Sequence, residues 1–498
     1  CATLEGVEAK RVAVEASFAR GLPGFSIVGL ADDEIMESRE RVKAALLHYG
    51  FEFPPLKILI NLSPADLTKS GSFFDLPIAL LVALYHDEIP DMGDFYVFGE
   101  LGLDGRVKAT SEIFALILSL ASQEGHLRVI VPSEIVQRVA MVPGVEAYGV
   151  ATLNDAIALL REHERPAPIE GGGLAYLRVE VGEIQGYYLS EYPLDFADVR
   201  GQEVAKRAAL IAAAGMHNLL LEGSPGCGKS MIIKRLRYIL PPMTLSDILD
   251  KARLQALEGK EPTFEPLRPF RSPHHSSTRA SIFGGGSGRA RIGEVALAHR
   301  GILFFDELPH YQKDVLEALR EPLEDRRITI SRVNSKVEYQ TDFLFVAAMN
   351  PCPCGNLLSQ SRACRCLPSE IQRYKNRLSD PLLDRIDLYV QMNESRLEDP
   401  AGDDSKSLHE RVIAAWMRQV ERGQTSLNGR LDETGIERFC PLSPEAQTLL
   451  AQAVTRFALS ARAIAKVRRV ARTIADLDGV QEITKEHLME ALSFRRRA

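Results

Sequence analysis

The sequence predicts an α/β protein of more than one domain, with a parallel sheet in its central part and a helical C-terminal part. Its 498 residues are too many for a single hydrophobic core. Short apolar runs alternate with helix-period stretches up to about Asn393, and after Pro400 the pattern is almost wholly helical. We therefore expect domains at 1–165, 194–395 and 396–498, with a linker at 166–193.

The composition is typical of a globular protein that stays in water. Apolar residues make up 45% and charged residues 26% of the chain, and the longest apolar stretch, 76–85, is well short of the roughly 20 residues of a membrane span. A net charge of −7 argues against a protein whose whole surface is coated by nucleic acid, so any DNA contact must be local. Four of the seven cysteines fall within 352–366, which indicates a metal site in a reducing compartment. We expect a cytoplasmic protein without a signal peptide or a membrane span.

The N-terminal part has the pattern of an independent α/β domain. Apolar, β-branched runs at 57–61 and 127–132 alternate with helix-period stretches such as 34–48. Near residue 164 the composition changes to Pro and Gly with little periodicity, as in Glu170-Gly-Gly-Gly173. This change places the linker at 166–193.

A glycine-rich loop follows an apolar strand and precedes a helix. The segment Gly223-Ser224-Pro225-Gly226-Cys227-Gly228-Lys229-Ser230 has the spacing G-x-x-x-x-G-K-S. In this context backbone N–H groups and the helix N-terminus surround phosphates, Lys229 neutralises the β and γ oxygens, and Ser230 ligates Mg²⁺. The sequence therefore predicts a site for ATP and Mg²⁺.

Two further apolar strands end in polar side chains that would complete this site. The strand at 301–305 is followed by Asp306 and Glu307, and the strand at 344–349 by Asn350. Asp306 is expected to hold Mg²⁺ through water, and Glu307 to polarise the water that attacks the γ-phosphate. Asn350 is expected to orient that water as a first sensor.

Four cysteines lie in a loop rich in Pro, Gly and Ser directly after this strand. Cys352 and Cys354 form one C-x-C pair, and Cys364 and Cys366 form a second. Four thiolates favour a tetrahedral Zn²⁺ ion in a structural role. Free thiols in a surface loop are the alternative.

Two basic segments are candidates for contact with DNA phosphates. Residues 327–339 alternate apolar and polar side chains about an Asn334-Ser335 turn, which predicts a β-hairpin carrying Arg332, Asn334 and Lys336. A Gly-rich stretch at 268–300 is the second candidate. Its candidate residues are Arg271, His274, His275, Arg279, Arg289 and Arg291. Such side chains can bind backbone phosphates, and a solvated surface is the alternative for each of them.

Several motifs occur together in this region of the chain. They are Arg268-Pro-Phe-Arg-Ser-Pro-His-His-Ser276, Gly293-Glu-Val-Ala-Leu-Ala-His299, Asp306-Glu-Leu-Pro309, Ala348-Met-Asn-Pro-Cys-Pro-Cys-Gly355 and Leu382-Leu-Asp-Arg-Ile-Asp387. This combination resembles the magnesium-chelatase-like AAA+ proteins of the ComM/YifB family, and the resemblance covers nearly the whole chain.

The resemblance implies an AAA+ P-loop ATPase core at 194–395, with a helix-2-type insert, a hairpin before the first sensor and the four-cysteine loop, and a helical lid at 396–498. It implies that Arg385 is an arginine finger for the neighbouring subunit's nucleotide. It also implies that Arg462, at the start of a lid helix, is a second sensor for its own subunit's γ-phosphate. An arginine supplied in trans implies a homo-oligomeric ring, which we expect to be a hexamer.

The resemblance further implies that 1–165 is a Lon-protease-like domain of the ribosomal S5 domain 2-like fold. A protease is therefore an alternative. Phe73 and Phe114 stand where proteolytic relatives have the Ser and Lys of their dyad, and without nucleophile and base there is no acyl-enzyme chemistry. Ser70, Ser72 and Lys108 leave a shifted dyad open. We expect the domain to assemble the ring or to bind DNA or a partner.

By resemblance, the expected function is an ATP-dependent DNA motor. It would be a branch-migration helicase that acts on single-stranded and branched DNA and aids integration of single strands in natural transformation and recombination. Two alternatives remain: a magnesium-chelatase-like motor that remodels a protein partner, and a scaffold that senses ATP without hydrolysing it. The set of Lys229, Asp306, Glu307 and Arg385 speaks against the scaffold.

Overall fold

The structure is a computed structural model. It describes residues 1–5, 8–51, 53–87, 89, 94–162, 166–285, 291–331, 336–394, 400 and 402–496, without the side chains of Arg291, Ser331 and Lys336. The chain forms two compact units. The first consists of Cys1–Ala175, Ala252–Phe264 and Ser331–Val337, and the second of Tyr176–Lys251, Glu265–Ile330 and Glu338–Ala498.

The first unit is built from two three-stranded sheets and the helices between their strands. One sheet has the order β3 (Ala13–Ala19), β5 (Lys57–Ser63), β4 (Gly24–Val28), in which β3 is antiparallel and β4 parallel to β5. The other is parallel, with the order β10 (Val145–Val150), β9 (Leu127–Pro132), β6 (Phe95–Val97). The remaining elements are β1 (Ala2–Glu5), β2 (Glu8–Arg11), β7 (Glu100–Leu101), β8 (Val107–Lys108), α1 (Asp33–His48), α2 (Asp75–Ala83), α3 (Ser111–Glu124), α4 (Val136–Val139) and α5 (Leu153–Arg161).

The two phenylalanines at the dyad positions of the first unit are part of its core. Phe73 and Phe114 are buried side chains. The Ser72 hydroxyl donates to the carboxylate of Glu100. Lys69 is also buried, and its ammonium donates to the backbone oxygens of Gly29, at 2.8 Å, and of Pro64. These contacts give Ser72 a carboxylate partner and give Lys69 a role in satisfying backbone carbonyls.

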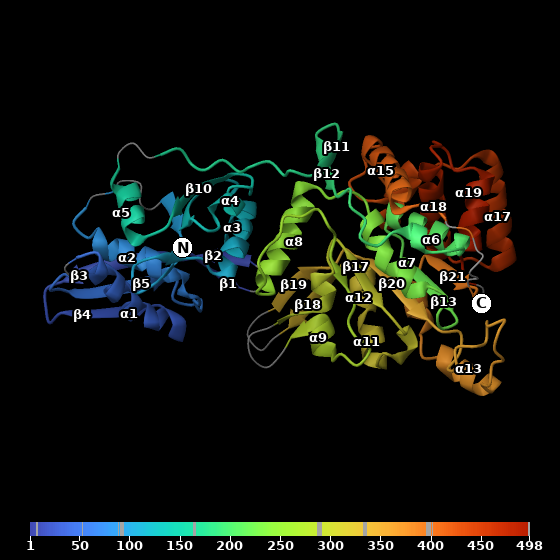
Figure 1. Ribbon diagram of the computed structural model, residues 1–498, viewed down its shortest axis with the longest axis horizontal. Helices are drawn as coiled ribbons and strands as arrows, with labels where there is room; N and C mark the ends of the chain where they lie inside the picture. Colours follow the sequence, from blue (N-terminus) through green and yellow to red (C-terminus); the bar gives the residue numbers. More distant parts are fainter. Residues whose placement is uncertain are drawn as a thin grey trace. The chain divides into compact units, whose positions relative to one another are not determined.

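A five-stranded parallel sheet forms the centre of the second unit (Figure 1). Its order is β14 (Phe270–Arg271), β17 (Ile302–Phe305), β20 (Leu344–Met349), β13 (Leu219–Gly223), β21 (Leu388–Met392). The strands β13, β17 and β20 are buried on both faces, as expected for apolar runs covered by helices on either side. The predicted parallel α/β sheet is thus confirmed.

Helices and hairpins surround this sheet along the chain. The helices are α6 (Glu203–Gly215), α7 (Lys229–Leu236), α8 (Leu245–Leu257), α9 (Arg279–Phe283), α10 (Glu294–Leu297), α11 (Lys313–Ala318), α12 (Arg320–Glu324), α13 (Pro368–Lys375) and α14 (Asp380–Leu383). The antiparallel pairs are β11 (Leu177–Val181) with β12 (Ile184–Tyr188) and β15 (Gly284–Gly285) with β16 (Arg291–Ile292). A further two-stranded sheet consists of β18 (Arg327–Ser331) and β19 (Lys336–Gln340). The two strands of the hairpin expected at 327–339 are therefore present, its turn lies outside the described residues, and the segment expected to be a linker contains the β11–β12 hairpin.

The C-terminal part is helical, as predicted. It consists of α15 (Ser405–Glu421), α16 (Glu433–Phe439), α17 (Pro444–Phe457), α18 (Ala461–Leu477) and α19 (Lys485–Ser493). Among the described residues, no helix combines the length and the apolar character that crossing a membrane requires.

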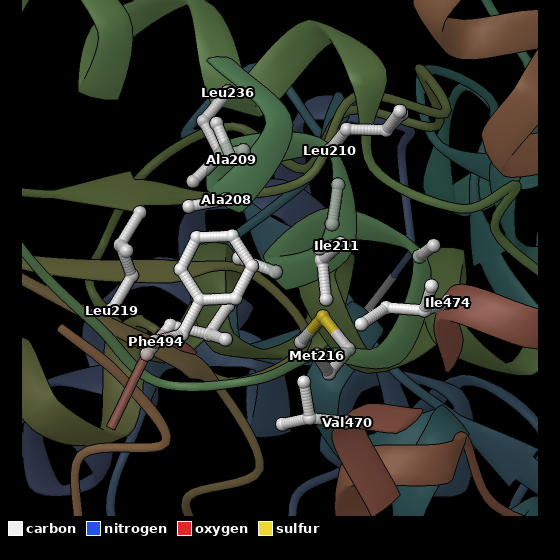
Figure 2. Packing of buried hydrophobic residues seen from close by; sticks show 14 of the residues in the cluster. Ala208, Ala209, Leu210, Ile211, Met216, Leu219, Leu236, Val470, Ile474 and Phe494 are labelled. Atoms are coloured by element: carbon white, nitrogen blue, oxygen red, sulfur yellow. The ribbon is translucent and has the colours of Figure 1, made fainter. Parts of the chain in front are cut away.

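The helical part shares one core with the sheet. Ile211 and Met216, in and just after α6, pack with Leu219 of β13 and with Val470 and Ile474 of α18 (Figure 2). Small alanines of α6 let its neighbours approach closely, and each fully buried Leu or Ile side chain adds roughly 1.5–3 kcal/mol to stability. Helix α18 thereby shares its core with α6 and with the strand that leads into the glycine-rich loop.

Candidate nucleotide site

Three neighbouring strands of the sheet end at residues predicted for the ATP site. The order β17-β20-β13 and the parallel register keep the carboxyl ends of these strands together. Asp306 follows β17, Asn350 follows β20, and Gly223 ends β13. Ligands of open parallel sheets bind at this edge.

The Lys229 side chain lies inside the glycine-rich loop. Its ammonium donates to the backbone oxygens of Gly223 at 2.6 Å and Ser224 at 3.0 Å, and to Asn350 Oδ1 at 3.2 Å. Burial lowers the pKa of Lys229. A phosphate group bound in the loop would favour the charged form, since an opposite charge offsets the cost of burial.

Two glycines leave the loop open for phosphates. Gly226 and Gly228 have φ angles of 82° and 95°, which glycine adopts without strain, and a Cβ at either position would meet nothing within 4 Å. Lys229 begins α7 directly after Gly228. The loop can therefore direct N–H groups and a helix N-terminus at the same anion.

A hydroxyl and a carboxylate meet where a magnesium ion would be needed. Ser230 Oγ donates to Asp306 Oδ2 at 3.2 Å, and the N–H of Glu307 donates to Asp306 Oδ1 at 2.9 Å. Oxygen ligands of this type suit Mg²⁺, which also keeps several water ligands. The Glu307 side chain is 54% exposed, so its carboxylate can reach a water molecule.

A histidine of the basic stretch lies beside Glu307. His275 Nε2 is 4.0 Å from Glu307 Oε2, and its ring stacks on that of His310 with centroids 6.0 Å apart. The sequence predicts a DNA contact for His275, and the structure brings its ring to the carboxylate of the nucleotide site. His310 was missed, because a single histidine three residues after Glu307 carries no motif.

The four cysteines converge in the loop between β20 and α13. Their sulfur atoms all lie within 4.8 Å of one another. Cys352 Sγ is 3.5 Å from Cys354 Sγ and 3.7 Å from Cys364 Sγ, and Cys354 Sγ is 3.6 Å from Cys364 Sγ. A tetrahedron with Zn–S bonds of about 2.3 Å has edges of about 3.8 Å. The donor set and its spacing therefore fit Zn²⁺.

Known proteins match the chain along almost its full length. Residues 14–135 match the family model of subunit ChlI of Mg-chelatase, 195–399 that of magnesium chelatase, subunit ChlI, and 402–495 that of the ChlI C-terminal part. Competence protein ComM of Haemophilus influenzae is 37% identical and covers 98% of this chain and 95% of its own length. The chain belongs to the ComM/YifB family. The uncharacterized protein YifB of Escherichia coli K12 is also 37% identical, with coverage of 98% of this chain and 95% of its own.

Membership in the ComM/YifB family makes the second unit a magnesium-chelatase-like AAA+ domain, which indicates an ATPase that uses ATP and Mg²⁺. The five-stranded sheet and the helical C-terminal part agree with this fold class.

Both arginines expected near the γ-phosphate are held by one carboxylate. Arg385 donates to Glu324 Oε2 and, at 2.5 Å, to the backbone oxygen of Pro381. Arg462 donates to Glu324 Oε1. The contact of Arg462 with the γ-phosphate of its own subunit stays a prediction. The structure places Arg462 beside Arg385, because the Ser460-capped start of α18 faces α12.

Glu324 is a candidate positioning residue that sequence reasoning missed. The hydrogen bond from Arg385 lowers the pKa of Glu324, with Arg462 acting in the same direction. Glu324→Gln is expected to lower kcat for ATP hydrolysis roughly ten- to a hundredfold by misplacing Arg385, with KM for ATP nearly unchanged. Steady-state ATPase assays beside Glu321→Gln, from the same helix, would check this. A wild-type kcat would show that Glu324 does not position the arginine.

The other DNA candidates are divided between internal contacts and residues that are not described. Arg271 forms an ion pair with Glu294, with contacts of 2.5 and 3.1 Å, and His274 Nδ1 is 2.7 Å from Ser276 Oγ. Arg279 is exposed at the start of α9. Arg289, Arg332 and Asn334 lie outside the described residues, as do the side chains of Arg291 and Lys336.

Proposed function

We propose that this protein is a ring-forming ATPase that moves DNA. The observation that carries the ATPase part is the convergence of Lys229, Ser230, Asp306 and Asn350 on one sheet edge, with hydrogen bonds of 3.2 Å from Lys229 to Asn350 and from Ser230 to Asp306. The DNA part is supported by the relative named Competence protein ComM and by the basic hairpin that precedes β20.

The proposed roles follow the geometry of the site. The loop from Gly223 to Ser230 binds the phosphates, with Lys229 on the β and γ oxygens. Ser230 and Asp306 hold Mg²⁺, Glu307 polarises the attacking water, and Asn350 orients it. The attacking water must lie in line with the γ-phosphate and the bond that breaks, and the shared sheet edge permits this arrangement.

A second subunit is proposed to complete the site. Arg385 Nε is buried and has no hydrogen-bond acceptor within the described part of the chain, and Glu324 already holds two guanidinium groups. In a ring, the neighbouring subunit's γ-phosphate would offer Arg385 a stronger acceptor than Glu324. We propose a hexamer, in which Arg462 acts as the second sensor.

Zinc is proposed as a structural ion of the Cys352, Cys354, Cys364 and Cys366 cluster. It would supply four bonds to a loop that contains no helix or strand from 350 to 367.

Domain 1–165 is proposed as the part that assembles the ring or recognises a partner, and the cytoplasm as the place of action. The DNA motor is proposed to promote branch migration during natural transformation and recombination.

DNA is expected to stimulate ATP hydrolysis through the β18–β19 hairpin. In Arg332→Ala/Lys336→Ala, stimulation by single-stranded and branched DNA should be lost while basal hydrolysis persists, since phosphate contacts dominate such binding. ATPase assays with and without each DNA would measure this. Arg178→Ala, on the exposed β11–β12 hairpin, is the control.

Hydrolysis indifferent to any DNA in the wild-type protein would exclude the DNA motor. It would favour the second candidate, a magnesium-chelatase-like motor that remodels a protein partner, which the matches to magnesium chelatase subunits support.

A further inference from the structure

The four-cysteine loop, residues 350–367, touches the glycine-rich loop at two places, and the helix after it makes a third contact with the strand that leads into the glycine-rich loop. The first contact lies just before the cysteines. Asn350 Oδ1 accepts from the Lys229 ammonium at 3.2 Å, and only Pro351 separates it from the fully buried Cys352. A displacement of Cys352 would therefore be transmitted to the amide that contacts Lys229.

The second contact lies between the two cysteine pairs. Gly355 directly follows Cys354, and a Cβ at this position would lie 2.6 Å from Pro225 Cδ and 2.7 Å from Pro225 Cγ. Real Cβ atoms do not approach other atoms this closely, so the four-cysteine loop rests on the glycine-rich loop with no space between them. Gly355 also has a φ angle of 79°, which favours glycine.

The third contact comes from the helix that follows the cysteines. Lys375, in the last turn of α13, lies 3.7 Å from Glu222 Oε1. Glu222 precedes Gly223, its side chain is 1% exposed, and its other oxygen accepts from Gln391 Nε2 at 3.2 Å. A buried carboxylate needs a positive partner, so the strand leading into the glycine-rich loop depends on the position of α13.

From these contacts we infer that the four-cysteine metal site forms one wall of the nucleotide site and that metal occupancy sets the affinity of the glycine-rich loop for ATP. The inference rests on the proposed ATP and zinc sites and deepens both. It gives the metal a regulatory effect in addition to its structural one.

The physical reason is the cost of ordering the loop. Fixing the backbone of one residue costs roughly 1–2 kcal/mol, and the four-cysteine loop has little apolar burial to offset this beyond Pro351 and Cys352. Metal–thiolate bonds can supply that free energy, since metal binding and local folding are coupled. Without the metal, Gly355, Asn350 and Lys375 would lose their fixed positions against the glycine-rich loop.

A variant that keeps all four thiols but disturbs the contact tests the coupling. Gly355→Ala should retain one zinc per chain by elemental analysis, while its Kd for a fluorescent ATP analogue rises at least tenfold. Gly423→Ala is the matched control, because Gly423 has a similar φ angle of 75° and a Cβ there would meet nothing within 4 Å. Lys375→Ala, which leaves Gly355 in place, should also weaken ATP binding with zinc retained.

Metal removal tests the same coupling in the unaltered chain. Stripping zinc with a chelator should raise the Kd for the analogue, and added Zn²⁺ should restore it. The control is Cys440→Ala, which removes a cysteine outside the cluster and should retain zinc and bind the analogue as the wild type does. If Gly355→Ala and Lys375→Ala both retained zinc and both bound the ATP analogue with wild-type affinity, the inference would be overturned and the proposed function would stay intact. If the wild-type protein contained no zinc, the proposed metal site would be refuted. If the wild-type protein did not bind the analogue, the proposed ATP site would be refuted.

Discussion

Glu307→Gln is expected to stop ATP turnover while ATP stays bound. The carboxylate follows β17 at the sheet edge, next to Asp306, and is exposed enough to reach a water molecule. Loss of a general base typically lowers kcat by about 10²–10⁴-fold. Because Lys229 and Ser230 remain, the Kd for an ATP analogue should stay within about threefold of the wild type. Single-turnover hydrolysis and equilibrium titration would measure the two quantities separately.

The control for this variant is Glu317→Gln, which removes a carboxylate from α11 outside the sheet edge. It should hydrolyse ATP as the wild type does. If Glu307→Gln kept substantial activity, another group would have to act as the general base for the water, and His275, 4.0 Å from Glu307, is a candidate.

The convergence of residues at the candidate ATP site could be predicted from sequence because its parts are local. Each of Lys229, Asp306 and Asn350 directly follows an apolar strand or a glycine-rich loop, and parallel strands bring their carboxyl ends together. The hairpin at β18–β19 was likewise visible as an alternation of apolar and polar side chains.

The contacts that connect distant segments could not be predicted. Glu324 accepts a hydrogen bond from Arg462, which lies 138 positions away in the sequence. Lys375 of α13 lies beside Glu222 of β13, although several strands and helices separate them along the chain. Such pairs depend on how elements pack, and no periodicity or spacing encodes them. The β11–β12 hairpin was missed because its surroundings are rich in Pro and Gly, a composition that favours a linker.

Arg385→Ala is expected to reduce kcat for ATP hydrolysis by about 10³–10⁵-fold, the range for an arginine that stabilises a phosphoryl-transfer transition state. ATP affinity should change little, because the phosphate-binding loop is untouched. Steady-state kinetics and analogue titration would measure these effects. Arg411→Ala, an ion-paired arginine of α15, is a suitable control. A fall confined to KM would show that Arg385 contributes to binding and not to the transition state.

Whether Arg385 acts on the neighbouring subunit can be decided by mixing two inactive variants. A Glu307→Gln subunit keeps Arg385, and an Arg385→Ala subunit keeps Glu307, so an interface between them in one orientation contains both groups. Random mixing of equal amounts in a head-to-tail ring makes about a quarter of the interfaces complete. ATPase activity should therefore rise from both ends of a mixing series to a maximum near equal amounts. Mixing Glu307→Gln with Lys229→Ala should recover nothing, because both variants are defective on the nucleotide-binding side of the interface. If the first series also stayed flat although the subunits exchange, Arg385 would have to act within its own chain, and the requirement for a ring would lose its chemical basis.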